Sequence, residues 1–392
     1  MARIGIYGGT FNPPHKGHMM AAQQAICRLA LDRLLLIPNK IAPHKDLPTD
    51  SAGPRRRTDM LRLAAKDLPK AEISELELER DGVSYTYETI LTLKQQYPSE
   101  ELILLMGTDM FLCFDRWKNP QIIWENATLG VFYRGDREEV SLIDEKKREL
   151  EALGAKVILV DNPVHRMSST DLRRMLTFGC GRAMLSEDVY AYILENRLYG
   201  TAESYRNLSE EELERKVSAL LDPGRIAHVL GCRETAVALA KHWGASETDA
   251  ARAALLHDVT KALPEDLQLT LCREYGRILK AFSVQNPKTL HALTGSMVAE
   301  RIFGEKEAVV EAVRSHTTGK VNMSLLEKII YIADYIEPSR DFPGADTLRS
   351  LAFTDLDEAL KMGLNMTIDM LQSRNQEVSP ESLEALAYLE HR

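Results

Sequence analysis

The first half of the chain alternates short apolar runs with longer amphipathic stretches. Runs of this kind are typical of buried strands, and the stretches between them are typical of helices. Strand, helix and strand in repeated order predict a doubly wound α/β fold, a parallel sheet with helices on both faces. Such sheets bind ligands beyond the carboxyl ends of their strands. We expect strands at residues 4–7, 34–37, 102–106, 129–133 and 156–160, and helices at 17–31, 87–96 and 143–153.

The pattern changes near residue 208, after which helical stretches follow one another without a clear strand. Proline and glycine mark the breaks, as at Asp222-Pro223-Gly224 and Phe342-Pro343-Gly344. The second half is therefore predicted to be an all-α domain. We expect an α/β domain at 1–203 and an all-α domain at 208–392, with helices at 210–221, 225–243, 248–262, 291–303, 306–315, 325–336 and 355–373.

Composition narrows the choice of partners. A chain of 392 residues is too long for one ordinary core, which agrees with two domains. The formal net charge of −9 argues against a nucleic-acid partner, but a few local charges can still bind small phosphorylated ligands. The apolar runs are too short to span a bilayer, no signal-peptide pattern is visible, and the five cysteines are scattered. We therefore expect a cytoplasmic protein with no membrane partner, and the sequence leaves a homo-oligomer open.

One motif follows the first predicted strand directly and leads into a helix. Residues Gly8 to His18 read GGTFNPPHKGH, which is neither a P-loop nor a dinucleotide fingerprint. The paired glycines Gly8 and Gly9 let the backbone approach a phosphate without a Cβ clash. His15 and His18 would then face a phosphate chain at the helix start, where free N–H groups favour anions.

A second motif follows the last predicted strand. Residues 168–173 read SSTDLR, a good helix start with Ser or Thr as the cap and Asp171 in the first turn. Its backbone amides would point at a phosphate, and Arg173 adds a bidentate phosphate donor.

The two motifs together resemble those of one family. His15-Lys16-Gly17-His18 resembles the [TH]-x-G-H signature of the nucleotidyltransferase superfamily, in the form found in nicotinate-mononucleotide adenylyltransferases. Residues 167–173 resemble that family's Ile-Ser-Ser-Thr-x-Ile-Arg element, with Met167 and Leu172 in place of the isoleucines. The resemblance covers residues 1 to 200 or so. It implies adenylyl transfer from ATP to nicotinate mononucleotide with release of pyrophosphate, and Mg²⁺ bridging the phosphates.

The resemblance also implies residue roles. Three further segments match the family, namely Pro43-His44-Lys45, residues 84–87, and Gly107-Thr108-Asp109 with the Arg116-Trp117 pair that follows. A different acceptor, such as phosphopantetheine or a sugar phosphate, stays open. The implied ATP-binding residues are Gly8, Gly9, Thr10, Phe11, His15, His18, Gly107, Asp109, Ser169, Thr170 and Arg173; those for nicotinate mononucleotide are Lys45, Thr86 and Trp117; the catalytic ones are His15, His18, Lys45 and Arg173.

The helical half holds a spread set of residues of the metal-binding type. Asp258 follows His257 inside an apolar stretch that we predict to be one helix, and Asp334 stands on another apolar helix. A charged carboxylate there is costly unless it is paired or bound to metal. Imidazole and carboxylate ligands suit iron, manganese and zinc. The candidate ligands are His228, His257, Asp258, His291, His316 and Asp334.

Their order resembles the HD phosphohydrolase superfamily, and the surrounding residues resemble the symmetrical diadenosine-tetraphosphate hydrolases over residues 208 to 390 or so. The resemblance implies metal-dependent hydrolysis of dinucleoside polyphosphates, with iron as the first choice and manganese or zinc as alternatives. A nucleotide sensor without turnover and a phosphatase for other nucleotides stay open. Our hypothesis is a two-metal site, in which His228, His257 and Asp334 hold one ion, His291 and His316 hold the other, Asp258 bridges them, and Lys261 steadies a phosphate.

Overall fold

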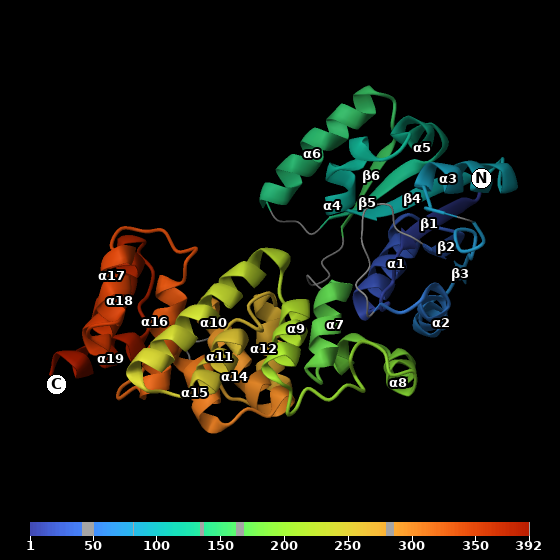
Figure 1. Cartoon of the computed structure of the whole chain (residues 1–392). Helices are drawn as coiled ribbons and strands as arrows, with labels where there is room; N and C mark the ends of the chain where they lie inside the picture. Colours follow the sequence, from blue (N-terminus) through green and yellow to red (C-terminus); the bar gives the residue numbers. More distant parts are fainter. Residues whose placement is uncertain (41–50, 81, 134–136, 162–167, 280–285, 392) are drawn as a thin grey trace. The chain divides into compact units, whose positions relative to one another are not determined.

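A computed structural model describes residues 1–40, 51–80, 82–133, 137–161, 168–279 and 286–391. Its contacts divide the chain into two compact units, Met1–Thr177 with Gly181–Ala202, and Phe178–Cys180 with Glu203–Arg392. Among the residues that the structure describes, the strands all lie in the first unit and the second unit contains helices (Figure 1). The predicted fold class, an α/β unit followed by an all-α unit, is confirmed.

The first unit is built on a parallel sheet with strand order β3-β2-β1-β4-β5-β6. The chain runs outward from β1 to β3, then returns to β4 on the other side of β1. The sheet therefore has its topological switch point between β1 and β4, where ligands bind in folds of this type. The strands are β1 (Arg3–Gly9), β2 (Arg33–Pro38), β3 (Ala71–Ile73), β4 (Glu101–Gly107), β5 (Thr128–Tyr133) and β6 (Val157–Asp161).

Both faces of this sheet are buried, which is why its strands are continuous apolar runs. Leu102 and Leu104 of β4 belong to one core cluster, and Ile103 and Leu105 belong to the other. Residues of α1 and α2 complete the second cluster, and residues of α3, α5 and α6 complete the first. The helices of this unit are α1 (Lys16–Arg28), α2 (Pro54–Ala65), α3 (Thr86–Gln96), α4 (Thr108–Leu112), α5 (Pro120–Asn126), α6 (Arg137–Ala152), α7 (Ser169–Thr177) and α8 (Glu187–Glu195).

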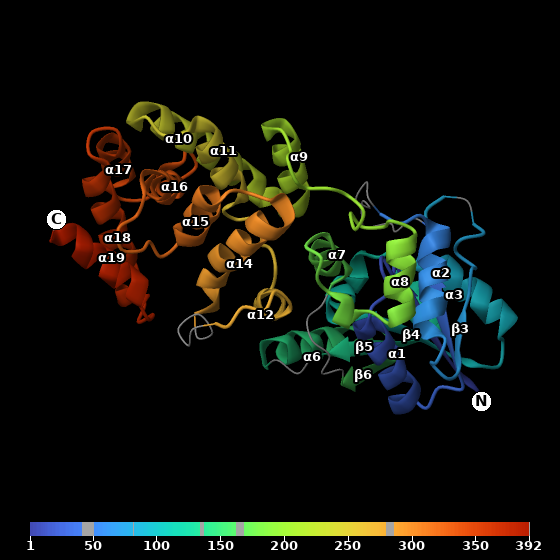
Figure 2. The same ribbon diagram turned by 90° about the horizontal axis from the view of Figure 1, so that it is seen from below.

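The second unit consists of packed helices, seen from below in Figure 2. Helix α10 packs against α11 and α16, and α15 packs against α14 and α16. Ser209 and Ser324 each open a helix with a capping box that a glutamate three residues later completes. The helices are α9 (Glu210–Leu220), α10 (Pro223–Trp243), α11 (Glu247–Leu256), α12 (Glu265–Glu274), α14 (Leu290–Val298), α15 (Glu307–Ser315), α16 (Leu325–Ile336), α17 (Ala345–Ala352), α18 (Leu356–Ser373) and α19 (Pro380–Glu390). Among the described helices, none combines the length and the apolar content needed to cross a bilayer.

One predicted helix is wrong in a way that matters for the site. The helix expected at 248–262 ends at Leu256, and His257 is its C-cap. Turns follow, in which Val259 N–H donates to Leu256 O at 3.1 Å and Lys261 N–H donates to Asp258 O at 2.9 Å. Asp258 therefore stands in a turn directly after α11 rather than inside an apolar helix. The apolar residues at 255–259 are buried because the turn itself is enclosed, so their pattern did not reveal the helix end.

Two candidate active sites

The first site starts at the loop between β1 and α1. His15 is the N-cap residue of α1, and His18 is the third residue of that helix. The backbone N–H of His15 donates to His18 Nδ1 at 3.2 Å, and the two rings lie with centroids 3.7 Å apart. Because Nδ1 of His18 accepts a hydrogen bond, the proton of the neutral ring lies on Nε2. His18 can therefore donate to a phosphate oxygen at the positive end of α1.

His15 is the more deeply buried of the pair. Its side chain is 5% exposed, and burial lowers its pKa to about 4. The ring is therefore neutral at pH 7. Its Nδ1 is buried without a hydrogen-bond partner among the described residues. A buried polar atom without a partner is unfavourable, so an incoming ligand atom would improve its environment.

The second motif docks on this loop. Arg173 of α7 donates from Nη1 to Asn12 O at 2.7 Å, and Ser169 donates to Pro13 O at 3.0 Å. Asn12 is held from a third side, because Tyr199 donates to its Oδ1 at 2.7 Å. The structure thus brings His15, His18, Ser169 and Arg173 to one loop, together with Thr170, whose Oγ1 accepts from Arg173 Nη2 at 3.2 Å.

The predicted glycines lie at the switch point of the sheet. Gly8 is in β1, and Gly107 ends β4 and caps α4. A Cβ built on either one would meet no atom of the described residues within 4 Å. Asp109, in the first turn of α4, is exposed. The carboxyl ends of these two neighbouring strands therefore face open space, as a bound nucleotide requires.

The side chain of Phe11 faces the core. We predicted it to bind ATP, but its side chain is 2% exposed and belongs to the core cluster that α1 covers. Its ring stands edge-on to His18, with centroids 5.2 Å apart. Phe11 therefore supports the His18 ring from the core. Gly9 lies against the same ring, and Thr10 Oγ1 accepts from Asn39 Nδ2 at 3.4 Å.

The residues expected to bind nicotinate mononucleotide are only partly placed. Thr86 opens α3, and the half-buried Trp117 packs on Phe114 with ring centroids 5.2 Å apart. Trp117 Nε1 is buried and has no hydrogen-bond partner among the described residues, so it can serve a ligand. The described part of the structure records no contact between these residues and the histidine pair. Lys45 lies outside the described residues.

One residue of this site escaped the sequence analysis. The side chain of Arg57 in α2 is fully buried, at 0% exposure. It donates to Thr10 O at 2.6 Å, to Asn39 O at 2.7 Å and to Ala52 O at 3.2 Å. Its hydrogen bonds within the described chain thus go to backbone carbonyls of the loops that follow β1 and β2 and of the turn before α2. An arginine on a helix with several other cations carries no sign of burial, so its sequence context could not single it out.

The second site is a cluster in the helical unit, where the six predicted ligands converge. Nε2 of His228 lies 3.3 Å from Nε2 of His257 and 3.2 Å from Oδ1 of Asp334. Nε2 of His291 lies 3.2 Å from Nε2 of His316. The side chains come from α10, α16, α14 and the ends of α11 and α15.

Asp258 stands between the two groups. Its Oδ2 lies 3.4 Å from His257 Nε2 and 3.8 Å from His228 Nε2. Its Oδ1 lies 3.3 Å from His291 Nε2 and 3.8 Å from His316 Nε2. This Oδ1 is also buried without a hydrogen-bond partner within the described chain. The carboxylate thus presents one oxygen to each pair of histidines, the arrangement of a bridging ligand.

The spacing of these atoms fits metal ions. With a metal–nitrogen distance of about 2.1 Å and angles of about 90° to 109°, two ligand atoms lie about 3.0 to 3.4 Å apart. The closest distances in the cluster, 3.2 and 3.3 Å, fall in this range. Four buried imidazoles around one buried carboxylate also form a donor set that iron, manganese and zinc accept.

The far side of each imidazole is held in place. Nδ1 of His257 donates to Ala254 O at 2.6 Å, and Nδ1 of His316 donates to Val313 O at 2.6 Å. Nδ1 of His291 donates to Lys288 O at 2.8 Å. Each bond sets the tautomer and turns Nε2 toward the cluster, as outer hydrogen bonds do for metal-binding histidines.

The charges of the cluster also suit a cation. Burial would raise the pKa of Asp258, but His257, His316 and Lys261 outweigh it and hold that pKa well below its usual range. Burial lowers the pKa of His291, and His316 adds to the effect. Burial opposes protonation of His257 as well, but Asp258 raises its pKa above the ordinary value. The ionised Asp258 beside the neutral His291 is the form in which these groups bind metal, whereas a metal ion would compete with a proton for His257.

Four residues around the cluster escaped the sequence analysis. Glu337 Oε1 accepts from His228 Nδ1 at 3.0 Å, and Cys232 Sγ lies 3.6 Å from His228 Nε2. The other two are Arg225 and Arg340, which contact Asp258 and Asp334. Arg225 precedes His228 by one helical turn, a spacing that could have indicated it. Glu337 and Arg340 lie beyond the end of α16, and only the tertiary fold brings them back to the cluster.

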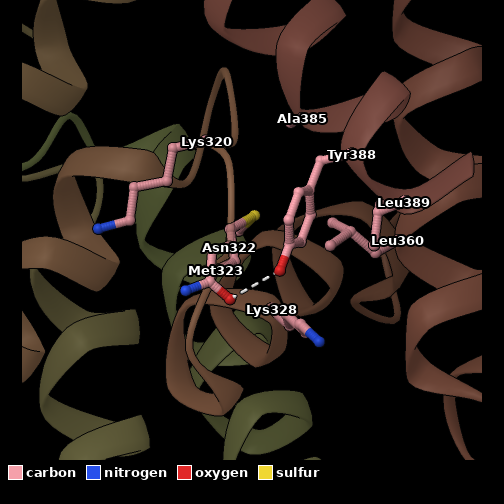
Figure 3. A pocket seen from close by; sticks show the side chains of 8 residues that line it. All are labelled: Lys320, Asn322, Met323, Lys328, Leu360, Ala385, Tyr388 and Leu389. Atoms are coloured by element: carbon pink, nitrogen blue, oxygen red, sulfur yellow. Dashed lines mark hydrogen bonds between the residues drawn. The ribbon is translucent and has the colours of Figure 1, made fainter. Parts of the chain in front are cut away.

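A separate hollow lies between α16, α18 and α19, shown in Figure 3. Tyr388 donates to Asn322 Oδ1 at 3.2 Å across it. Its two lysines are already paired, Lys320 with Glu311 and Glu327, and Lys328 with Asp357. Because carboxylates neutralise both cations, this hollow is poorly suited to a phosphate. It contains none of the six clustered ligands.

Comparisons with known proteins match each unit separately. Residues 6–175 match the Cytidylyltransferase-like family, and residues 225–339 match the HD domain family. The chain is 36% identical over 198 residues to a "Probable nicotinate-nucleotide adenylyltransferase" of Dictyoglomus thermophilum, covering 50% of this chain and 99% of the relative.

Two relatives come from one organism, Bacillus subtilis. Its nicotinate-nucleotide adenylyltransferase is 32% identical over 201 residues, covering 51% of this chain and 99% of the relative. Its symmetrical bis(5'-nucleosyl)-tetraphosphatase is 38% identical over 177 residues, covering 45% of this chain and 94% of the relative. Each relative thus spans about half of this chain and is matched over nearly its whole length.

Proposed function

The N-terminal half of the chain belongs to the nicotinate-nucleotide adenylyltransferases and the C-terminal half to the HD-domain symmetrical bis(5'-nucleosyl)-tetraphosphatases, and we propose that one chain catalyses both reactions. The first is adenylyl transfer from ATP to nicotinate mononucleotide. The second is hydrolysis of dinucleoside polyphosphates such as diadenosine tetraphosphate to two molecules of ADP. The observation that carries the proposal is the convergence of each half's polar residues on one place within its own unit.

In the transferase, the phosphate of nicotinate mononucleotide attacks the α-phosphorus of ATP, and the bond to pyrophosphate breaks. No side-chain nucleophile is needed, so the residues act by positioning and by neutralising charge. His18 Nε2 would donate to the triphosphate, and the Gly8 and Gly107 backbone would leave room for it. Arg173 is held by Asn12 within reach of the same loop. Mg²⁺, when bound, would neutralise negative charge on the phosphates.

The transferase is tested by replacing His18 and by varying the acceptor. We expect His18→Ala to lower kcat strongly while the protein stays folded. Arg28→Ala, at an exposed position in the last turn of the same helix, is the matched control and should keep its activity. Near-normal turnover of the His18 variant would remove this side chain from the catalytic set. Nicotinate mononucleotide, nicotinamide mononucleotide and phosphopantetheine, assayed side by side, decide the acceptor.

In the hydrolase, water attacks phosphorus and the central P–O bridge of the tetraphosphate breaks, so that each product keeps two phosphates. His228, His257 and Asp334 would hold one divalent ion, His291 and His316 the other, and Asp258 both. Iron is our first choice of metal, with manganese or zinc as alternatives. Such ions supply an activated water and neutralise phosphate charge. Lys261, whose side chain is 39% exposed, would steady a phosphate.

The hydrolase is tested through Asp258. We expect Asp258→Ala to lose bound metal and diadenosine-tetraphosphate hydrolysis together, and to keep adenylyl transfer. Asp346→Ala is the control, because this aspartate is 97% exposed and should affect neither reaction. If the unaltered protein binds nucleotide but releases no ADP from the tetraphosphate, the HD half is a sensor instead.

The setting of both reactions follows from simpler observations. We assign residues 1–203 to the transferase and 208–392 to the hydrolase. All five cysteines are free thiols, which favours the cytoplasm. The partners we propose are ATP, nicotinate mononucleotide and dinucleoside polyphosphates, without nucleic acid or membrane.

A further inference from the structure

Two arginines contact the acidic ligands of the cluster around Asp258. Arg225 donates from Nε to Asp258 Oδ2 at 2.7 Å. Arg340 donates from Nη2 to Asp334 Oδ1 at 2.6 Å. Each guanidinium thus occupies a carboxylate oxygen that the proposed function assigns to a metal ion.

The two arginines also connect the cluster with solvent. The side chain of Asp258 is 1% exposed, whereas those of Arg225 and Arg340 are 32% and 37% exposed. An anion that approaches the buried cluster from solvent can therefore meet a guanidinium. Arg225 lies in the first turn of α10, a helix of 21 residues whose free N–H groups add positive potential there.

A divalent ion bound to these carboxylates would make them less favourable partners for the arginines. Like charges repel strongly at short distance in a partly buried site, so each guanidinium would be pushed off the ligand oxygen. Arg340 stays near the cluster because its Nε is also bonded to Asp334 O at 2.9 Å, and the backbone of Arg225 is fixed beside the cluster in the first turn of α10. The displaced forks would face the incoming ligand. A guanidinium fork matches two oxygens of a phosphate.

We propose that Arg225 and Arg340 form a phosphate-binding subsite beside the metal cluster, which takes the polyphosphate chain of a nucleoside polyphosphate. This inference rests on the proposed hydrolase function and names the residues that would bind its substrate. Asp258 Oδ1 is buried and makes no hydrogen bond within the described chain, which supports the metal cluster beside which the subsite would lie. Each phosphate of a dinucleoside tetraphosphate carries one negative charge, and two divalent ions with two arginines balance these charges once the carboxylates of Asp258 and Asp334 are counted.

The test uses the full-length protein loaded with Mn²⁺ and the variants Arg225→Gln and Arg340→Gln. We expect the KM for diadenosine tetraphosphate to rise by about tenfold or more in each, the effect of losing one charge-assisted hydrogen bond. Binding of ADP, measured by calorimetry, should weaken by a similar factor. Mn²⁺ should stay bound with unchanged or higher affinity, because a competing cation has been removed. Arg225→Lys keeps the positive charge but lacks the two-pronged guanidinium. Its KM should lie between that of the unaltered protein and that of Arg225→Gln.

The control is Arg233→Gln, which removes a guanidinium from the same helix. Arg233 pairs with Glu214 rather than with a cluster residue, so its loss should leave KM, ADP binding and Mn²⁺ content unchanged. Loss of Mn²⁺ in the Arg225 and Arg340 variants would show that the arginines support the metal ligands and would overturn the subsite. An unchanged KM and an unchanged ADP affinity would also overturn the subsite. The proposed hydrolase function would not be affected by that result. Arginine-dependent ADP binding without any hydrolysis would instead refute the proposed function and keep the subsite.

Discussion

Replacing Arg57 by leucine should destabilise the first unit and disturb its nucleotide-binding loop together. The guanidinium donates hydrogen bonds to the backbone carbonyl oxygens of Thr10, Asn39 and Ala52, at 2.6, 2.7 and 3.2 Å. Each hydrogen bond to a charged group contributes about 1.5–3 kcal/mol, so the three together contribute about 5–9 kcal/mol. Removing a fully buried charge returns several kcal/mol of desolvation energy. The net loss in the free energy of unfolding is therefore about 3 kcal/mol.

That loss is large enough to measure. For a unit of roughly this size, 3 kcal/mol lowers Tm by about 6–12 °C. Trp117 and Trp124 lie in the first unit and Trp243 lies in the second, so tryptophan fluorescence during thermal unfolding reports mainly on the first unit. Adenylyl transfer measured at a temperature well below the transition separates loss of stability from loss of loop geometry. We expect the KM for ATP to rise even where the variant is fully folded.

Arg62→Leu is the matched control on the same helix. Arg62 is 50% exposed and pairs with Asp59 and Glu75, and exposed pairs contribute about 1 kcal/mol or less. If Arg57→Leu unfolds within 2 °C or so of Arg62→Leu and transfers adenylyl groups equally well, the buried guanidinium is not what holds the loops, and the reasoning is refuted.

Three further predictions test other contacts. Glu337→Gln should weaken metal binding by about 10- to 100-fold, because the carboxylate that orients His228 through Nδ1 is lost; equilibrium dialysis with Mn²⁺ measures this, and unchanged affinity would contradict it. The pKa of His15 is about 4 in the folded protein and 6.5 in the unfolded chain, so the unfolded chain binds the proton more tightly and acid favours unfolding. As the pH falls from 6.5 to about 4, the free energy of unfolding of the first unit should decrease by up to about 3 kcal/mol. His15→Gln should remove this part of the pH dependence in urea titrations. Tyr199→Phe should cost about 1 kcal/mol, because Asn12 Oδ1 then keeps only the longer hydrogen bond from Ala52 N–H at 3.3 Å, and a Tm equal to that of the unaltered protein would rule out a supporting role.

The elements that could be predicted are those whose pattern is local. Strands β1, β2, β4, β5 and β6 were expected because a sheet covered on both faces requires uninterrupted apolar runs. β3 (Ala71–Ile73) was missed because three residues are too few to show a periodicity. Helix α2 was missed although its buried face includes Met60 and Leu61, because Arg57 stands on that face and interrupts the apolar pattern.

Some residues of the candidate sites could likewise be predicted from local sequence, and others could not. The six clustered ligands could be singled out because a histidine or aspartate among apolar neighbours needs a reason to be there. Glu337 and Arg340 look like ordinary surface charges in the sequence, and only tertiary contacts distinguish them, whereas the spacing of Arg225 from His228 was a signal that went unused. Phe11 lies inside a predicted binding motif, and its side chain packs into the core, so a contact with ATP would have to come from its backbone.

The two proposed sites would bind polyphosphates by opposite electrostatic means, which would allow one acidic chain to catalyse both reactions. At the proposed transferase site, imidazole N–H groups, a helix start and Arg173 would meet the anion directly. At the proposed hydrolase site, Asp258 and Asp334 would repel phosphate until metal ions are bound. In this proposal the hydrolase site binds phosphate only when metal ions are present, whereas the transferase site binds it through backbone and side-chain N–H groups without a prior metal ion. Because each set of residues comes from one unit, neither site needs the other for its chemistry, which agrees with the separate Bacillus subtilis relatives.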